Sequence, residues 1–83
     1  MMKVTVKQQD IKDDRCRHDD KQSPFAVALT RQTGMPWVVS GDVVVCLQTH
    51  TRLVLTGAAL GMEKGWRRGD GAYPGDFVLR RKS

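Results

Sequence analysis

The sequence predicts a small α+β fold: a mainly antiparallel sheet of about five strands, with two short helices on one face. Two observations lead to this fold class. Short runs rich in valine and leucine, each bounded by turn-forming residues, are typical of strands. Two other segments carry helix start and stop signals and interrupt these runs, which gives the order β-α-β-β-β-α-β. Eighty-three residues suffice for one hydrophobic core, so we expect a single domain spanning residues 1–83.

The first strand is predicted at residues 3–7, where Val4 and Val6 alternate with polar or basic residues. This periodicity is lost over residues 8–22, which hold five aspartates, four basic residues and one large apolar residue, Ile11. We expect a polar connection there, either solvated throughout or containing a single short turn.

The first helix is predicted to begin after Ser23, whose side-chain oxygen can accept a helix N–H as an N-cap. Pro24 follows at the first helical position, where its missing N–H has no consequence. Apolar residues then recur at helical spacing from Phe25 onward, and Gly34 ends the helix as the C′ residue. So short a helix depends on tertiary packing for its stability.

Three strands are predicted in the middle of the chain, at residues 37–39, 42–47 and 52–55. Ser40-Gly41 is a pair suited to the tight hairpin turn between the first two. Residues 43–47 are apolar on both faces, which is typical of a central strand covered from both sides.

The second helix is predicted to begin after Thr56 and to run to about Arg68. Glycines recur along it at four-residue spacing, at positions 57, 61, 65 and 69. They can form a smooth ridge that lets another backbone approach, or they can mark a frayed helix with Gly69 as its C-cap. The final strand is predicted at residues 76–81, and residues 80–83 form a basic tail that extends it or frays.

Four stretches occur in a characteristic order: Val4-Thr5-Val6 with Ile11 following, Pro24 to Leu29, Trp66 to Gly69, and Pro74 to Leu79. In order and spacing they resemble a group of small uncharacterised proteins encoded by bacteriophages and prophages. In that group a short strand precedes a "C-x-x-C-P" helix start and an "A-x-A-L"-like helix. An aromatic–acid–x–Gly turn and a "P-F-x-F-x-L" strand then close the chain. The resemblance covers both ends of the chain and the first helix.

This sequence departs from the group at several positions. Asp20 and Ser23 occupy the two cysteine positions of the group, so a metal or redox role of that cysteine pair is absent. Arg67 stands where the group has an acidic residue after the aromatic one. Gly75 stands where the closing motif of the group has its first aromatic residue. The resemblance therefore implies the fold and a phage origin, and it carries no assigned chemistry.

Cys16, His18, Cys46 and His50 have the ligand types of a structural zinc site. Their spacing does not fit, because Cys-x-His is too tight and a straight strand would separate Cys46 from His50 by roughly 13 Å. We therefore expect no metal, with Cys46 buried and Cys16 at the surface, both reduced.

Other residue groups point away from catalysis. His18-Asp19-Asp20 with Ser23 contains the residue types of a hydrolase triad, but Ser23 is better placed as an N-cap. The pair Asp13-Asp14 could bind Mg²⁺, as could Asp19-Asp20, but basic residues flank each pair. We expect no enzymatic activity and no cofactor. Without a membrane-spanning stretch or a signal-peptide pattern, the sequence predicts a cytoplasmic protein. The resemblance to phage proteins implies that this cytoplasm is that of a host bacterial cell.

Positive charge is concentrated at the C-terminal end of the chain. The net charge is +5, and the last twenty residues hold six basic residues against two acidic ones. Such a segment indicates a surface that contacts an anionic partner. We predict that the basic residues of this segment bind the partner, together with Trp66, because tryptophan and arginine are enriched at binding hot spots. The predicted partner-binding residues are Lys64, Trp66, Arg67, Arg68, Arg80, Arg81 and Lys82. Trp66 can equally pack in the core.

Two functions remain open at this point. The first is a non-catalytic phage protein that binds a host protein complex, as an inhibitor of a bacterial defence nuclease in the manner of an anti-CRISPR protein. The second is a small basic nucleic-acid-binding accessory or regulatory protein that contacts phosphates through the C-terminal arginines and Lys82. We favour the first, because no known nucleic-acid-binding motif can be recognised in the sequence.

Overall fold

The computed structural model describes residues 2–11, 21–69 and 72–82 of the chain. The predicted order of strands and helices is confirmed, with one additional short 3-10 helix after the first strand. The elements are β1 (Met2–Val6), η1 (Gln8–Asp10), α1 (Pro24–Thr33), β2 (Trp37–Ser40), β3 (Val43–Cys46), β4 (Arg52–Val54), α2 (Gly57–Arg68) and β5 (Gly75–Arg81).

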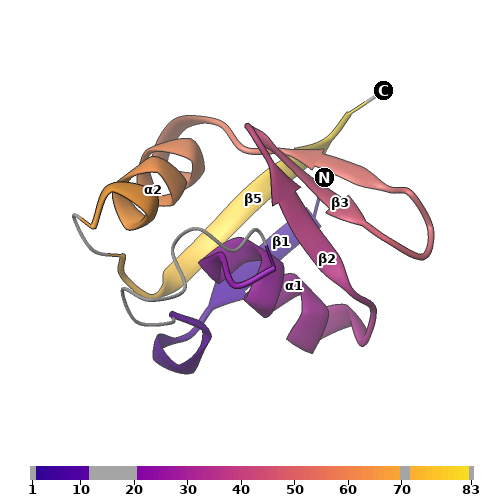
Figure 1. The fold of residues 1–83 in the computed structure, drawn as a ribbon, viewed down its shortest axis with the longest axis horizontal. Helices are drawn as coiled ribbons and strands as arrows, with labels where there is room; N and C mark the ends of the chain where they lie inside the picture. The colour runs from indigo at the N-terminus through magenta and orange to yellow at the C-terminus, as the bar shows by residue number, and fades with distance from the viewer. Residues whose placement is uncertain (1, 12–20, 70–71, 83) are drawn as a thin grey trace.

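The five strands form one curved, fully antiparallel sheet, a half-barrel in the order β1-β5-β4-β3-β2 (Figure 1). The last strand of the chain therefore lies between β1 and β4. The first five residues of β5, Gly75 to Leu79, pair with β1, whereas Arg80 and Arg81 pair with β4.

Both helices pack on the same face of the sheet, here called the inner face, as the sequence predicts. Alternate residues of every strand point to this face and form one core with residues of α1 and α2. The strand residues of this core are Val4, Val6, Trp37, Val39, Val44, Cys46, Leu53, Phe77 and Leu79. Phe25 of α1 meets Phe77 edge to face, with ring centroids 5.1 Å apart.

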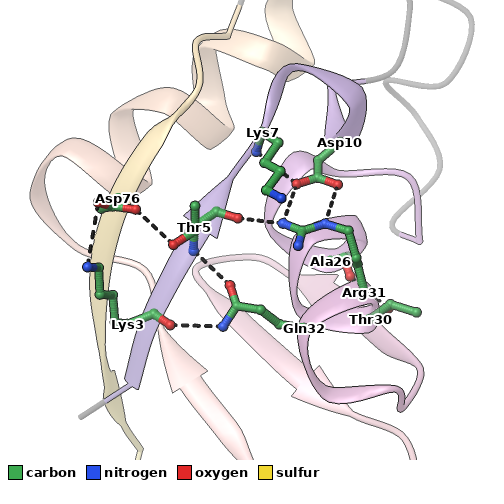
Figure 2. Close-up of polar contacts among 9 residues, drawn as sticks. All are labelled: Lys3, Thr5, Lys7, Asp10, Ala26, Thr30, Arg31, Gln32 and Asp76. Atoms are coloured by element: carbon green, nitrogen blue, oxygen red, sulfur yellow. Dashed lines mark hydrogen bonds and ion pairs between the residues drawn. The ribbon is translucent and has the colours of Figure 1, made fainter.

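The helix α1 also covers the two outermost strands of the sheet. Figure 2 shows the contacts with β1: the Gln32 side-chain amide donates to the carbonyl of Lys3 and accepts the N–H of Thr5, while Arg31 donates to the carbonyl of Thr5. At the other edge, the hydroxyls of Thr30 and Thr33 accept the backbone N–H and the indole N–H of Trp37. These side chains satisfy backbone groups that an open sheet edge would leave exposed.

Several sequence predictions are corrected or refined at the level of single elements. The β2–β3 turn is Gly41-Asp42, because Ser40 pairs with Val43; the positive φ of Gly41 (63°) fits a type II′ turn. The polar connection begins with η1, and Asp10 within it is buried. Most of that connection, residues 12–20, lies outside the described residues.

The predicted basic tail is part of the sheet. Arg80 and Arg81 pair with β4, and the N–H of Lys82 donates to the carbonyl of Arg52 at 2.8 Å. The prediction that β3 is covered from both sides is also wrong for the described part of the chain, since both helices lie on the inner face. The outer face of β3 is thus left without a helix above it, although its residues are valines.

Candidate interaction surface on the outer face of the sheet

The predicted partner-binding residues do not form one continuous patch. Lys64, Arg67 and Arg68 lie in the last turns of α2, which leads through a short connection into the start of β5 (Figure 1). Arg80 lies at the opposite end of that strand, about 17 Å from Gly75 at the usual rise of a strand. The structure therefore divides the predicted residues into an α2 group and a β5 group.

Trp66 and Arg67 of the α2 group make contacts within the fold. Trp66 is only 4% exposed, so its ring is not available to stack on a partner, and the interpretation of Trp66 as a core residue holds. Arg67 donates from Nε to Oε2 of Glu63 at 2.7 Å, with its guanidinium 5.9 Å from the centroid of the Trp66 ring. Lys64 and Arg68 are exposed.

Glu63 is a buried acidic residue that sequence reasoning missed. It is 1% exposed, and besides Arg67 it contacts the hydroxyl of Ser23, which donates to Oε1. Ser23 does occupy the N-cap position of α1, but its side chain makes no capping hydrogen bond. The helical spacing of Ala59, Met62 and Trp66 places Glu63 on the same buried face, and this spacing is the signal that could have identified it.

The β5 group is divided between the two faces of the sheet, because side chains alternate along a strand. Arg81 pairs with the buried Leu53 and therefore lies on the inner side, beyond the end of the core. Arg80 pairs with Val54 on the outer face. Lys82 lies on the outer face as well, two positions further along.

Arg52 of β4 joins Arg80 and Lys82 on the outer face, although the sequence analysis did not identify it. Its carbonyl accepts the N–H of Lys82, which places the two residues opposite each other, and on its other side Arg52 pairs with Val45. Arg80 lies 28 positions after Arg52 in the chain, so only the strand order brings them together. Both Arg52 and Lys82 line a shallow depression that Ser40, Asp42, Val43 and Val45 complete.

The outer surface, as we call it here, combines these three cations with the valines that the register places on the same face. The valines are Val38, Val43, Val45, Val54 and Val78. Val78 is 60% exposed, Val38, Val45 and Val54 are half-buried, and Val43 is buried. The surface is thus apolar in its middle and basic along β4 and β5.

The cations of the outer surface differ from Lys3, Arg31 and Arg67 in their electrostatic environment. Lys3 lies 3.6 Å from Asp76, and Arg31 and Arg67 bind buried carboxylates. Among the residues that the structure describes, no carboxylate lies within ion-pair distance of Arg52, Arg80 or Lys82. Their charges are therefore available to an external anion.

The described residues place Cys46 and His50 in different environments. Cys46 is fully buried with Sγ 4.0 Å from Sδ of Met35, whereas His50 is exposed in the β3–β4 turn. Burial raises the pKa of the Cys46 thiol, but hydrogen bonds from Thr49 and from the Gln48 amide outweigh it and leave the pKa below its ordinary value. Cys16 and His18 lie outside the described residues, and within residues 2–11, 21–69 and 72–82 no three His, Cys, Asp or Glu side chains cluster as metal ligands.

Comparison of the chain with protein-family models, with curated proteins and with solved structures gave no match in any of the three. The resemblance to small phage proteins accordingly stays a prediction. Neither helix in the described part of the chain has the length and apolar character needed to span a lipid bilayer.

Proposed function

We propose that this chain is a non-catalytic binding protein whose outer surface contacts an acidic surface of a partner protein. The observation that carries the proposal is the convergence of Arg52, Arg80 and Lys82 beside one exposed and several half-buried valines, with no carboxylate of the described residues within ion-pair distance of these cations. A partner with carboxylates at matching positions would supply the missing negative charge.

The placement of these charges supports a binding role over a purely solubilising one. Arg52 and Lys82 lie opposite each other on adjacent strands, and like charges in that position destabilise a sheet. Solubility alone could be served by charges spread over the surface. A cluster that works against stability is expected where a partner relieves the repulsion.

The amount of surface that the chain offers is sufficient for this role. A standard protein–protein interface buries about 800 Å² on each partner. The chain exposes 4918 Å² in total, so an interface on one face of the sheet would use about a sixth of it. A small protein that covers such an area can inhibit its partner by occlusion.

The finer proposal is that the protein is phage-encoded and inhibits a bacterial defence complex, in the manner of an anti-CRISPR protein, within the bacterial cytoplasm. Its support is the small size of the chain and the resemblance of its two ends and first helix to small phage proteins. An inhibitor with a basic contact surface would occupy an acidic region of its target.

A phage-restriction assay tests this proposal directly. Bacteria that carry an active CRISPR system matched to a phage are made to express the chain, and the plaque count is expected to recover. The variant Arg52→Gln/Arg80→Gln should abolish the recovery, whereas Lys64→Gln/Arg68→Gln, which removes the same net charge from α2, should retain it. Wild-type chain that leaves restriction intact across representative nuclease systems would contradict the finer proposal.

A nucleic-acid-binding function is the second candidate, favoured by the same three cations and the net charge of +5. Fluorescence anisotropy of labelled duplex DNA and single-stranded RNA at two salt concentrations separates it from the first. Binding that weakens steeply with salt and is lost in Arg52→Gln/Arg80→Gln would support it. We expect weak binding at low salt that the two charge-matched double variants reduce equally.

A further inference from the structure

We infer that the valines of the outer surface form the buried centre of the partner interface, and that the partner presents an apolar patch ringed by carboxylates. This inference rests on the proposed function and deepens it, because it assigns the contact to a particular kind of protein surface. Charge alone would be satisfied by any polyanion, whereas this arrangement requires an apolar complement.

The first argument is the pattern of β3. The strand has valines at both Val43 and Val45 on its outer side, while Val44 and Cys46 fill the core on its inner side. A strand that is apolar on both faces is typical of a sheet covered on both faces. In the described part of the chain the helices cover only the inner face, so the outer face has the composition of a surface that another molecule covers.

The second argument is that the valines are contiguous. Val38 pairs with Val45, and Val43 pairs with Val54, so four valines on three adjacent strands lie side by side. Opposite residues on neighbouring strands have Cβ atoms roughly 5 Å apart. Val43 is buried and the other three are half-buried, so the group is partly open to solvent. Single exposed apolar residues need no explanation, but a contiguous apolar group with a polar margin marks an interaction site.

The third argument identifies the occupant. Arg52, Arg80 and Lys82 border the valines along β4 and β5. A second copy of this chain in face-to-face contact would place cations against cations, which opposes self-association. Carboxylates around an apolar patch match both features of the surface, so a different protein with that pattern is the fitting partner.

The test uses two synthetic peptides as probes and nuclear magnetic resonance of the full-length, ¹⁵N-labelled protein. One peptide combines glutamates with leucines, and the other has serine in place of every leucine at equal charge. The chain is compared with Val45→Thr/Val54→Thr, in which an isosteric polar residue with good strand propensity replaces each valine. The control is Val27→Thr, which makes the same change at a half-buried position of α1.

The leucine-containing peptide is expected to shift the amide signals of β3, β4 and the end of β5. Its Kd should rise about tenfold in the double valine variant, as the loss of apolar contact at two positions implies, and stay unchanged in the control. Equal affinity for the two peptides, no binding of either, or no effect of the double variant would overturn the inference. Concentration-dependent shifts of the same signals without peptide would also overturn it, by showing that a second copy covers the surface.

The phage-restriction assay distinguishes failure of this inference from failure of the proposed function. If charge is what the partner recognises, the arginine variants lose inhibition while Val45→Thr/Val54→Thr keeps it, and only the inference fails. If the proposed function is wrong, the wild-type chain itself has no effect on restriction, whatever the peptides do.

Discussion

Asp10 and Arg31 form a partly buried ion pair that ties η1 to α1. Asp10 is 1% exposed; it accepts the N–H of Lys7 at 2.8 Å and two hydrogen bonds from the Arg31 guanidinium, from Nε at 3.1 Å and from a terminal nitrogen at 2.9 Å. The same terminal nitrogen of Arg31 also donates to the carbonyl of Thr5 (Figure 2). One side chain thus connects three elements, and its removal leaves a carboxylate in the interior without its main partner.

Removal of Arg31 is therefore predicted to destabilise the protein substantially. Arg31→Ala should lower the free energy of unfolding more than the loss of an exposed ion pair does, because the buried carboxylate of Asp10 loses its bidentate partner. Lys3→Ala breaks the exposed pair with Asp76 and should cost less than about 1 kcal/mol. Urea denaturation followed by circular dichroism measures both effects. Equal effects of the two substitutions would contradict the greater contribution of the Asp10–Arg31 pair to stability.

Ser23 provides a second prediction at this scale, because its two roles lead to opposite rankings of variants. As an N-cap it would be replaced better by aspartate than by alanine. As a donor to the buried Glu63, it would be replaced better by alanine, since aspartate would place a second carboxylate beside the first. We expect Ser23→Asp to be less stable than Ser23→Ala by at least about 1 kcal/mol in urea denaturation at neutral pH; the reverse ranking would favour the capping role.

The residue scale is also where sequence reasoning was least complete. It identified Arg80 and Lys82, which are adjacent in the chain to other basic residues, but it missed Arg52. It treated Trp66 as a binding candidate, although the residue is buried. Both outcomes have the same cause, since the neighbours of a side chain in space depend on strand order and helix packing, which composition does not specify.

At the scale of elements, the glycines of α2 have different roles. Gly69 ends the helix with a φ of 82°, a conformation that favours glycine and confirms its prediction as the C-cap. Gly61 lies on the exposed side, and a Cβ added there would meet no atom within 4 Å. A glycine ridge would bring another backbone of the fold close to Gly61, but the space beside Gly61 is open.

Alanine substitutions are predicted to change stability in opposite directions at these two positions. Gly61→Ala should raise the free energy of unfolding by roughly 0.5–1 kcal/mol, because alanine is the better helix former and has room. Gly69→Ala should lower it by about 1 kcal/mol, since alanine is strained at positive φ. Thermal denaturation reports both; destabilisation by Gly61→Ala would indicate that the helix is packed more closely at this position than the structure shows.

Most elements could be predicted because their signals are local. Ser23-Pro24 and Gly34 bound α1, alternating valines mark β1, and Gly69 ends α2. The β2–β3 turn was displaced by one residue, because Ser40-Gly41 and Gly41-Asp42 are both plausible turn pairs and only strand register separates them. Register is a tertiary property, so it could not be read from this segment alone.

At the scale of the whole molecule, α1 determines which parts of the sheet remain available to a partner. It packs on the inner face and its side chains bind both outermost strands, so partner binding by strand addition is opposed at the β1 edge. The outer surface is then the part of the sheet left to a partner. The fold class could be predicted from the sequence, whereas this division between covered and open faces follows from the position of the helices.

The contribution of α1 to edge protection gives a prediction for the whole molecule. Gln32→Ala removes the side-chain amide that binds Lys3 and Thr5 and should expose backbone groups of β1. We expect the variant to self-associate with increasing concentration, as seen by sedimentation velocity, with little change in circular dichroism. A variant that stays as monodisperse as the wild type would show that other features protect this edge.

Site-specific photo-crosslinking tests whether the outer surface binds a protein. A photoreactive phenylalanine derivative is introduced at Val78, the most exposed valine of the outer surface, or at Ala58, an exposed position of α2, and the chain is expressed in bacteria with an active defence system. We expect a discrete protein adduct from position 78 and none from position 58. An adduct from position 58 alone, or adducts to nucleic acid from position 78, would contradict it.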